Sequence, residues 1–152
     1  LVARTANVEG VGEITVRQLV RQALRMRPDR IVVGEVRGAE VVDLLAALNT
    51  GHDGGAGTVH ANSPEEVPAR LEALAALGGL DRAALHSQLA AAVQVLLHVS
   101  RGGDGRRLLS EIALLHRDDT ERVSALPAWH VDRGEQRGYR PLLQVIRDRC
   151  GR

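Results

Sequence analysis

A glutamate follows a short run of β-branched residues in this sequence of 152 residues. Ile31-Val32-Val33 is typical of a buried strand, and after Gly34 the chain reaches Glu35. A strand that ends in an acid delivers the carboxylate to the carboxyl edge of a sheet, where open α/β sheets bind ligands. A glutamate there can hold a metal-bound water or orient a water for attack on a phosphate. The alternative is an ordinary strand that ends in a solvated acid.

A second candidate segment, from Thr50 to Asn62, contains four glycines within seven residues. Core packing does not explain this spacing, which favours a loop whose backbone approaches another group closely or adopts positive φ. The neighbouring histidines and threonines could donate hydrogen bonds to phosphate oxygens. A zinc site is disfavoured because His52 and His60 are eight residues apart and no cysteine lies near them. A flexible surface loop is the competing interpretation.

The basic residues are all arginines, because the sequence contains no lysine. This excludes Schiff-base lysine chemistry and a P-loop, which needs a lysine on the phosphates. The net charge of +1 and the presence of only two aromatic residues, Trp129 and Tyr139, disfavour nucleic-acid binding. Four arginines around the first strand could contact a phosphate, but they are more simply ion-pair partners of nearby acids. These arginines are Arg25, Arg27, Arg30 and Arg37, and the acids are Asp29, Glu35, Glu40 and Asp43.

The length allows one domain or a large piece of one. A single cysteine, Cys150, permits no intrachain disulfide and fits a reducing cytoplasm. The sequence has no apolar run of membrane-spanning length and no signal peptide. Because the chain starts at Leu1 rather than at a methionine, we expect it to be a fragment.

Amphipathic periodicity and capping residues predict helices alternating with short strands in the first two thirds of the chain. Thr15 and Gln18 have the spacing of a capping box. Ser63-Pro64-Glu65-Glu66 is a helix start, and Asp81 can cap the helix that follows. The predicted helices cover residues 15–27, 39–50, 63–77 and 81–96, and the strands cover 31–33 and 58–61.

The remainder of the chain is predicted to be rich in strands. Residues 94–101 and 106–116 read as strands joined through Gly102-Gly103-Asp104-Gly105, a hairpin signal. A further strand is expected within 121–131 and a short helix over 142–149. The sequence therefore predicts an α/β fold with a carboxyl-terminal segment rich in β-hairpins.

These segments together resemble a known family, the secretion ATPases that serve type II and type IV secretion and pilus assembly and retraction. Residues 23–30 leading into 31–38 are similar to the Walker B region of that family. Residues 51–63 resemble its His box, and residues 7–13 fit the branch that powers Flp/Tad pilus assembly (CpaF-like), to which the match is closest. The resemblance covers about residues 1–115 in order and without a gap.

The resemblance implies roles for individual residues. Glu35 would be the Walker B glutamate, acting on a water associated with Mg²⁺, and Gly34 stands where an aspartate often does. His60 would be the His-box histidine near the γ-phosphate of ATP, with His52 a weaker candidate for the same network. Arg37 would link the nucleotide state to a neighbouring subunit. The nucleotide contacts implied by these motifs are Gly34, Arg37, His52 and Thr58.

The Walker A lysine and the Asp box of this family lie upstream of these motifs, and neither occurs in the chain. The chain therefore resembles the carboxyl-terminal portion of a RecA-like P-loop ATPase domain over residues 1–116. A strand and helix extension of the same domain follows over residues 117–152. Because a P-loop supplies most of the affinity for the β- and γ-phosphates, we expect negligible nucleotide affinity for the chain alone.

The family implies a cytoplasmic homo-hexamer at the inner face of the cell membrane, with no membrane span of its own. Such a motor couples ATP hydrolysis, with Mg²⁺, to pilus assembly or protein export, and its partners are inner-membrane platform proteins rather than nucleic acid. The alternative is a truncated, non-catalytic module that docks to secretion-system subunits. An intact P-loop in the sequence upstream would decide for the enzyme.

Overall fold

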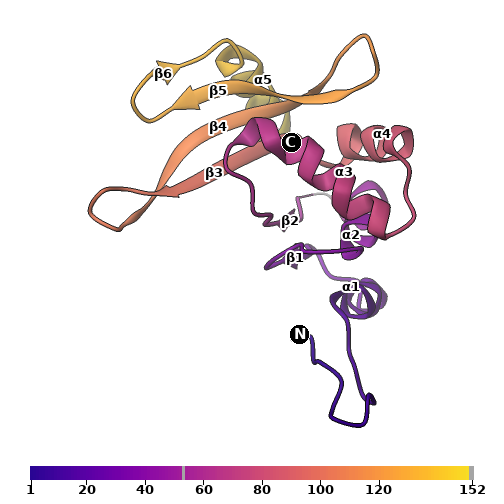
Figure 1. The fold of residues 1–152 in the computed structure, drawn as a ribbon. Helices are drawn as coiled ribbons and strands as arrows, with labels where there is room; N and C mark the ends of the chain where they lie inside the picture. The colour runs from indigo at the N-terminus through magenta and orange to yellow at the C-terminus, as the bar shows by residue number, and fades with distance from the viewer. Residues whose placement is uncertain (53, 151–152) are drawn as a thin grey trace.

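A computed structural model describes residues 1–52 and 54–150 of the chain and shows a mixed α/β fold with two sheets (Figure 1). The first sheet is parallel and joins β1 (Val32–Val33) to β2 (Ala56–Gly57). Around it lie α1 (Val16–Arg25), α2 (Glu40–Asn49), α3 (Val67–Leu77) and α4 (Arg82–Ala92). The second sheet is antiparallel, with the order β3 (Val95–Arg101), β4 (Arg107–Arg117), β5 (Val123–His130) and β6 (Gly134–Glu135). The helix α5 (Tyr139–Cys150) packs on β5.

The first helix begins as the sequence predicts. The Thr15 hydroxyl accepts a hydrogen bond from the Gln18 backbone N–H, and the Gln18 side chain accepts one from the Thr15 N–H at 2.8 Å, so the capping box is complete. Two ion pairs then hold α1 against α2. Arg17 Nε and Arg21 Nε lie 2.5 and 2.7 Å from the two oxygens of Asp43.

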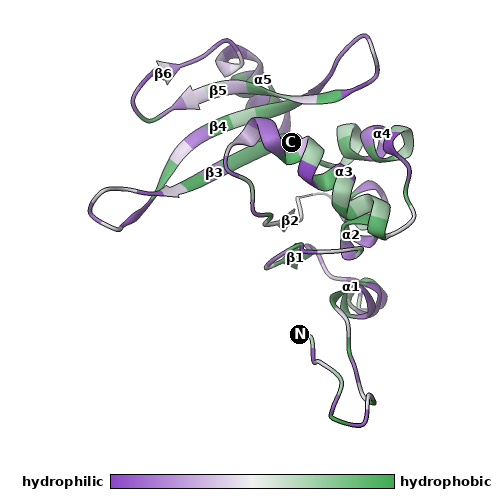
Figure 2. Cartoon of the chain, viewed as in Figure 1, coloured by the Kyte–Doolittle hydropathy of each residue, from purple (hydrophilic) through white to green (hydrophobic). Residues whose placement is uncertain are grey.

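Aliphatic side chains fill the main core, as the shortage of aromatic residues requires. In Figure 2 the hydrophobic colouring is concentrated where α2, α3 and α4 meet. Leu85, Leu89 and Ala75 are completely buried there. A second, smaller cluster of Leu114, Ala128 and Leu142 lies between the antiparallel sheet and α5.

A buried histidine, His86 on α4, joins the helices to the antiparallel sheet. Its Nδ1 accepts a hydrogen bond of 2.8 Å from the backbone N–H of Val123, the first residue of β5. Because Nδ1 accepts, the proton of the neutral ring is on Nε2, which lies 2.9 Å from Glu72 Oε1 on α3. This single side chain therefore connects α3, α4 and β5.

The predicted second strand is misplaced: the structure pairs residues 56–57 with β1, not residues 58–61. Close packing accounts for the glycines in and beside this strand. A Cβ on Gly55 would lie 2.6 Å from the Ile31 carbonyl oxygen and from Leu48 Cδ2, and one on Gly57 would lie 2.9 Å from Leu44 Cδ2. Glycines are thus the residues that fit between β1 and α2, which confirms the close approach that their spacing predicts.

Other boundaries also differ from the predictions. The fourth helix ends at Ala92 rather than near residue 96, because Val93 adopts an extended conformation that leads into β3. Ser63 makes no side-chain capping bond, and Pro64–Glu66 form a 3₁₀ turn, η1, before α3. The short strand β6 was not predicted. None of the helices over the described residues has the length and hydropathy needed to cross a bilayer.

Candidate active site

Glu35 and His60 follow neighbouring parallel strands. Val32 and Val33 of β1 pair with Ala56 and Gly57 of β2. Parallel strands end at the same edge of their sheet, so the loops that follow β1 and β2 lie together. At that edge His60 Nε2 is 2.8 Å from Glu35 Oε1. The structure thus brings the candidate acid and the candidate imidazole into direct contact.

Arg37 completes this three-residue cluster. Its Nε lies 2.5 Å from the same Glu35 oxygen, Oε1, and its side chain is 74% exposed, against 28% for the carboxylate. Oε1 itself is buried; Arg37 forms an ion pair with it, and the His60 ring lies in direct contact with it. One carboxylate oxygen is therefore shared by two side chains.

The charge of this cluster favours an ionised glutamate. The Arg37 guanidinium beside Glu35 holds the pKa of that carboxyl below its usual value, and His60 lowers it further, while partial burial acts in the opposite direction. The same contact raises the pKa of Arg37. Glu35 is consequently a carboxylate at neutral pH, the form that accepts a proton or holds a metal-bound water.

Replacing Arg37 with glutamine should raise the pKa of Glu35, because the main cause of its lowered value is removed. As the pH falls, the carboxylate of this variant becomes protonated at a higher pH than in the wild type. A ¹³C NMR titration of the Glu35 carboxyl measures this shift directly. Arg25→Gln, at the exposed end of α1, is the matched control and should leave the titration unchanged. Identical Glu35 titrations in the wild type and Arg37→Gln would contradict the assignment.

Gly34 and Thr58, both predicted to contact nucleotide, contact each other. The Thr58 hydroxyl donates a hydrogen bond to the Gly34 carbonyl oxygen, and the Thr58 carbonyl accepts one of 2.8 Å from the Val36 N–H. Thr58 therefore holds the backbone on both sides of Glu35. Its hydroxyl therefore has a structural contact within the protein.

His52 is not brought to the cluster. It precedes β2, whereas His60 follows it, so the two histidines lie toward opposite ends of the strand. Gly54, which follows His52 closely in sequence, lies beside Arg30, a residue that precedes β1. His52 Nδ1 is buried and has no hydrogen-bond partner within the described part of the chain. The role predicted for His52 beside His60 is not supported by this placement.

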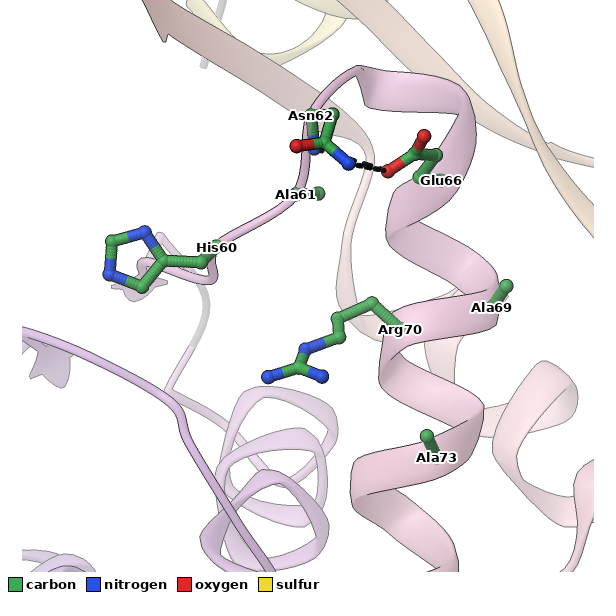
Figure 3. A pocket seen from close by; sticks show the side chains of 7 residues that line it. All are labelled: His60, Ala61, Asn62, Glu66, Ala69, Arg70 and Ala73. Carbon is green, nitrogen blue, oxygen red and sulfur yellow. Dashed lines mark hydrogen bonds between the residues drawn. The ribbon is translucent and has the colours of Figure 1, made fainter.

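A groove of about 590 Å³ runs from His60 along α3. Figure 3 shows the His60 and Arg70 side chains extending from their backbones toward the same side of this groove. Arg70 was missed by the sequence analysis, although its spacing from Glu66 and Ala73 places all three on one face of a helix. The lining residues are His60, Ala61, Asn62, Glu66, Ala69, Arg70 and Ala73.

The described residues contain no group of three or more His, Cys, Asp or Glu side chains that could hold a metal ion. Of the candidate site residues, Glu35 is the one with a carboxylate; its Oε1 is occupied by Arg37 and His60, which leaves Oε2 to face an ion or its water. Magnesium usually retains several waters and binds through one or two carboxylates together with substrate phosphates. Glu35 is therefore suited to contact a magnesium ion through a bound water, while substrate phosphates would be the principal ligands.

The candidate site thus consists of an acid and an imidazole at the ends of adjacent parallel strands, within a mixed α/β fold. The family model for type II/IV secretion system proteins matches residues 3–101. The chain belongs to this family of secretion-system proteins.

Relatives and a solved structure agree with the family. A putative conjugal transfer protein of Mycobacterium tuberculosis is 75% identical over 150 residues, 99% of this chain and 42% of that protein. The conjugal transfer protein TrbB of Rhizobium radiobacter is 40% identical over 91 residues, 60% of this chain and 28% of that protein. The crystal structure of the VirB11 ATPase from the Brucella suis type IV secretion system, in complex with sulphate, matches with a TM-score of 0.59 and 33% identity, over 65% of this chain and 31% of that chain. The chain thus spans less than half the length of these proteins.

Proposed function

We propose that this chain is part of an ATPase motor that couples ATP hydrolysis to pilus assembly or protein export. The observation that carries the proposal is the contact of 2.8 Å between Glu35 and His60 at the shared edge of β1 and β2. The likeness to the VirB11 ATPase supports the same reaction, ATP and water to ADP and phosphate. The resemblance of residues 7–13 to the CpaF-like branch favours an Flp/Tad pilus motor.

The chain's residues have distinct parts in this reaction. Ionised Glu35 would accept a proton from the attacking water or hold a water bound to Mg²⁺. The exposed imidazole of His60 would contact the γ-phosphate of ATP. Because the γ-phosphate and Glu35 would compete for this imidazole, the position of His60 would depend on whether ATP is bound. Bound Mg²⁺ would neutralise charge on the transferring phosphate.

The complete motor is proposed to be longer than this chain. Its upstream part would supply the Walker A lysine and the Asp box, so the chain alone would bind ATP weakly and be inactive. Residues 1–116 would complete a RecA-like domain, and residues 117–152 would extend it. The motor would work as a cytoplasmic homo-hexamer at the inner face of the membrane, against platform proteins.

His60→Ala tests this function in the longer protein. We expect steady-state ATP turnover to fall by about tenfold or more, because a group that contacts the transferring phosphate is removed. His52→Ala is the matched control and should keep wild-type turnover, since His52 lies toward the other end of β2. Equal turnover in the wild type and His60→Ala would remove His60 from the site and favour a non-catalytic docking module.

A further inference from the structure

The loop that carries Glu35 is held from two sides. From β2, Thr58 binds the backbone of Gly34 and Val36. From α2, Glu40 Oε1 accepts hydrogen bonds from the backbone N–H groups of Arg37 at 2.6 Å and Gly38 at 3.0 Å. The backbone is therefore fixed on both sides of the candidate catalytic carboxylate.

Glu40 is suited to this contact by its place in the chain. It is the first residue of α2, and the residue before it, Ala39, has no side chain that could cap the helix. A Cβ on Gly38 would lie 3.1 Å from Glu40 Oε2, so the glycine leaves room for the carboxylate to approach the loop. The hydrogen bonds to a carboxylate are charge-assisted and thus stronger than neutral ones.

The loop that carries His60 is closed in the same way. Glu66, in the turn that opens the next helix, accepts hydrogen bonds through Oε2 from the Asn62 backbone N–H at 3.2 Å and from its side-chain Nδ2 at 2.9 Å (Figure 3). Each of the two loops that meet at the site is therefore tied to the helix behind it by a glutamate. The recurrence argues against a chance contact of one flexible side chain.

We propose that Glu40 is a positioning residue for Glu35, a role that rests on the function proposed above. Glu40 acts through the backbone of Arg37, whose guanidinium it thereby places against the Glu35 carboxylate. It contacts neither the carboxylate nor the groove. Loss of its two hydrogen bonds should loosen Arg37 and disturb the proton-accepting geometry without unfolding the domain.

Amide hydrogen exchange in the full chain tests the contact itself. In Glu40→Ala the Arg37 and Gly38 amides should exchange at least tenfold faster than in the wild type, while amides of the antiparallel sheet keep their rates. Glu40→Gln should retain most of the protection because its amide oxygen still accepts both bonds. Glu65→Ala is the matched control, since Glu65 also lies in an opening turn and its side chain makes no hydrogen bond or ion pair in the described residues.

Kinetics of the longer protein test the consequence. We expect Glu40→Ala to lower kcat about tenfold with KM for ATP unchanged, and Glu40→Gln to restore most of the rate. If Glu40→Ala fails to fold, Glu40→Asp, whose shorter side chain does not reach the loop, gives the same comparison.

The possible failures are distinguishable. Unchanged exchange at Arg37 and Gly38 would overturn the contact. Faster exchange with wild-type kcat, in a protein that Glu35→Gln inactivates, would overturn the positioning role and leave the proposed function standing. If Glu35→Gln also has no effect on turnover, the proposed function fails and the positioning role fails with it.

Discussion

Replacing Glu35 with glutamine in the longer protein should lower kcat for ATP hydrolysis by about 10²–10⁴-fold, the usual contribution of a general base. Glutamine has nearly the same shape, so the loop between β1 and α2 should keep its conformation. Its amide cannot take a proton from water and carries no charge for a magnesium-bound water. Steady-state hydrolysis measures the loss, and titration with a fluorescent ATP analogue should show that nucleotide binding persists.

A second glutamate provides the control for this experiment. Glu9 is exposed in the turn near the amino terminus, and Glu9→Gln should hydrolyse ATP at the wild-type rate. Full turnover in Glu35→Gln would contradict the role of this carboxylate. Joint loss of hydrolysis and nucleotide binding would instead indicate that the substitution disturbs the fold of the site.

Replacing His86 with leucine should lower the free energy of unfolding by about 2–3 kcal/mol, because a buried N–H loses its partner and a carboxylate keeps only its contact with Arg82. The N–H is that of Val123, and the carboxylate is that of Glu72. Leucine has a similar size but no polar atom, so the loss measures the hydrogen bonds rather than a cavity. Urea unfolding followed by circular dichroism gives the free energy.

His116→Leu is the matched control, because His116 is exposed near the end of β4. It should change stability by less than about 0.5 kcal/mol. If both variants unfold at the wild-type midpoint, His86 does not hold α4 to β5. If only His86→Leu is destabilised, the buried connection between helices and sheet is established.

The features that sequence reasoning could find are local ones. The capping box needs only Thr15 and Gln18, three residues apart, and it is present. The glycine-rich segment required either positive φ or close packing, and both occur: Gly51 and Gly54 have φ of 97° and 82°, and Gly55 lies against Ile31. The acid after the strand lies at the sheet edge as expected, because strand direction alone decides that position.

The features that could not be found depend on contacts distant in sequence. Asp43 was expected to pair with arginines near the first strand, but its partners are Arg17 and Arg21, which precede it by 26 and 22 residues on another helix. Glu40 looked like another ion-pair partner and instead binds backbone amides. A periodic pattern indicates which face of a helix is apolar, but it does not indicate which helix the polar face meets.

The two histidines of the glycine-rich segment show the same limit at short range. His52 and His60 are both flanked by small and polar residues, and the sequence places both near phosphate. The structure separates them because β2 lies between them in the chain, so that His52 precedes the strand and His60 follows it. The predicted roles of His52 and His60 therefore depended on the position of β2, a strand of two residues. Packing of its glycines against α2 fixes that position.

Arg37 and His60 both meet Glu35 through Oε1, and no contact of Oε2 is found in the described part of the chain. A carboxylate tethered by one atom is free to bind and release a proton at the other. In the proposed function the Arg37 contact with Oε1 would persist when His60 turns to the γ-phosphate.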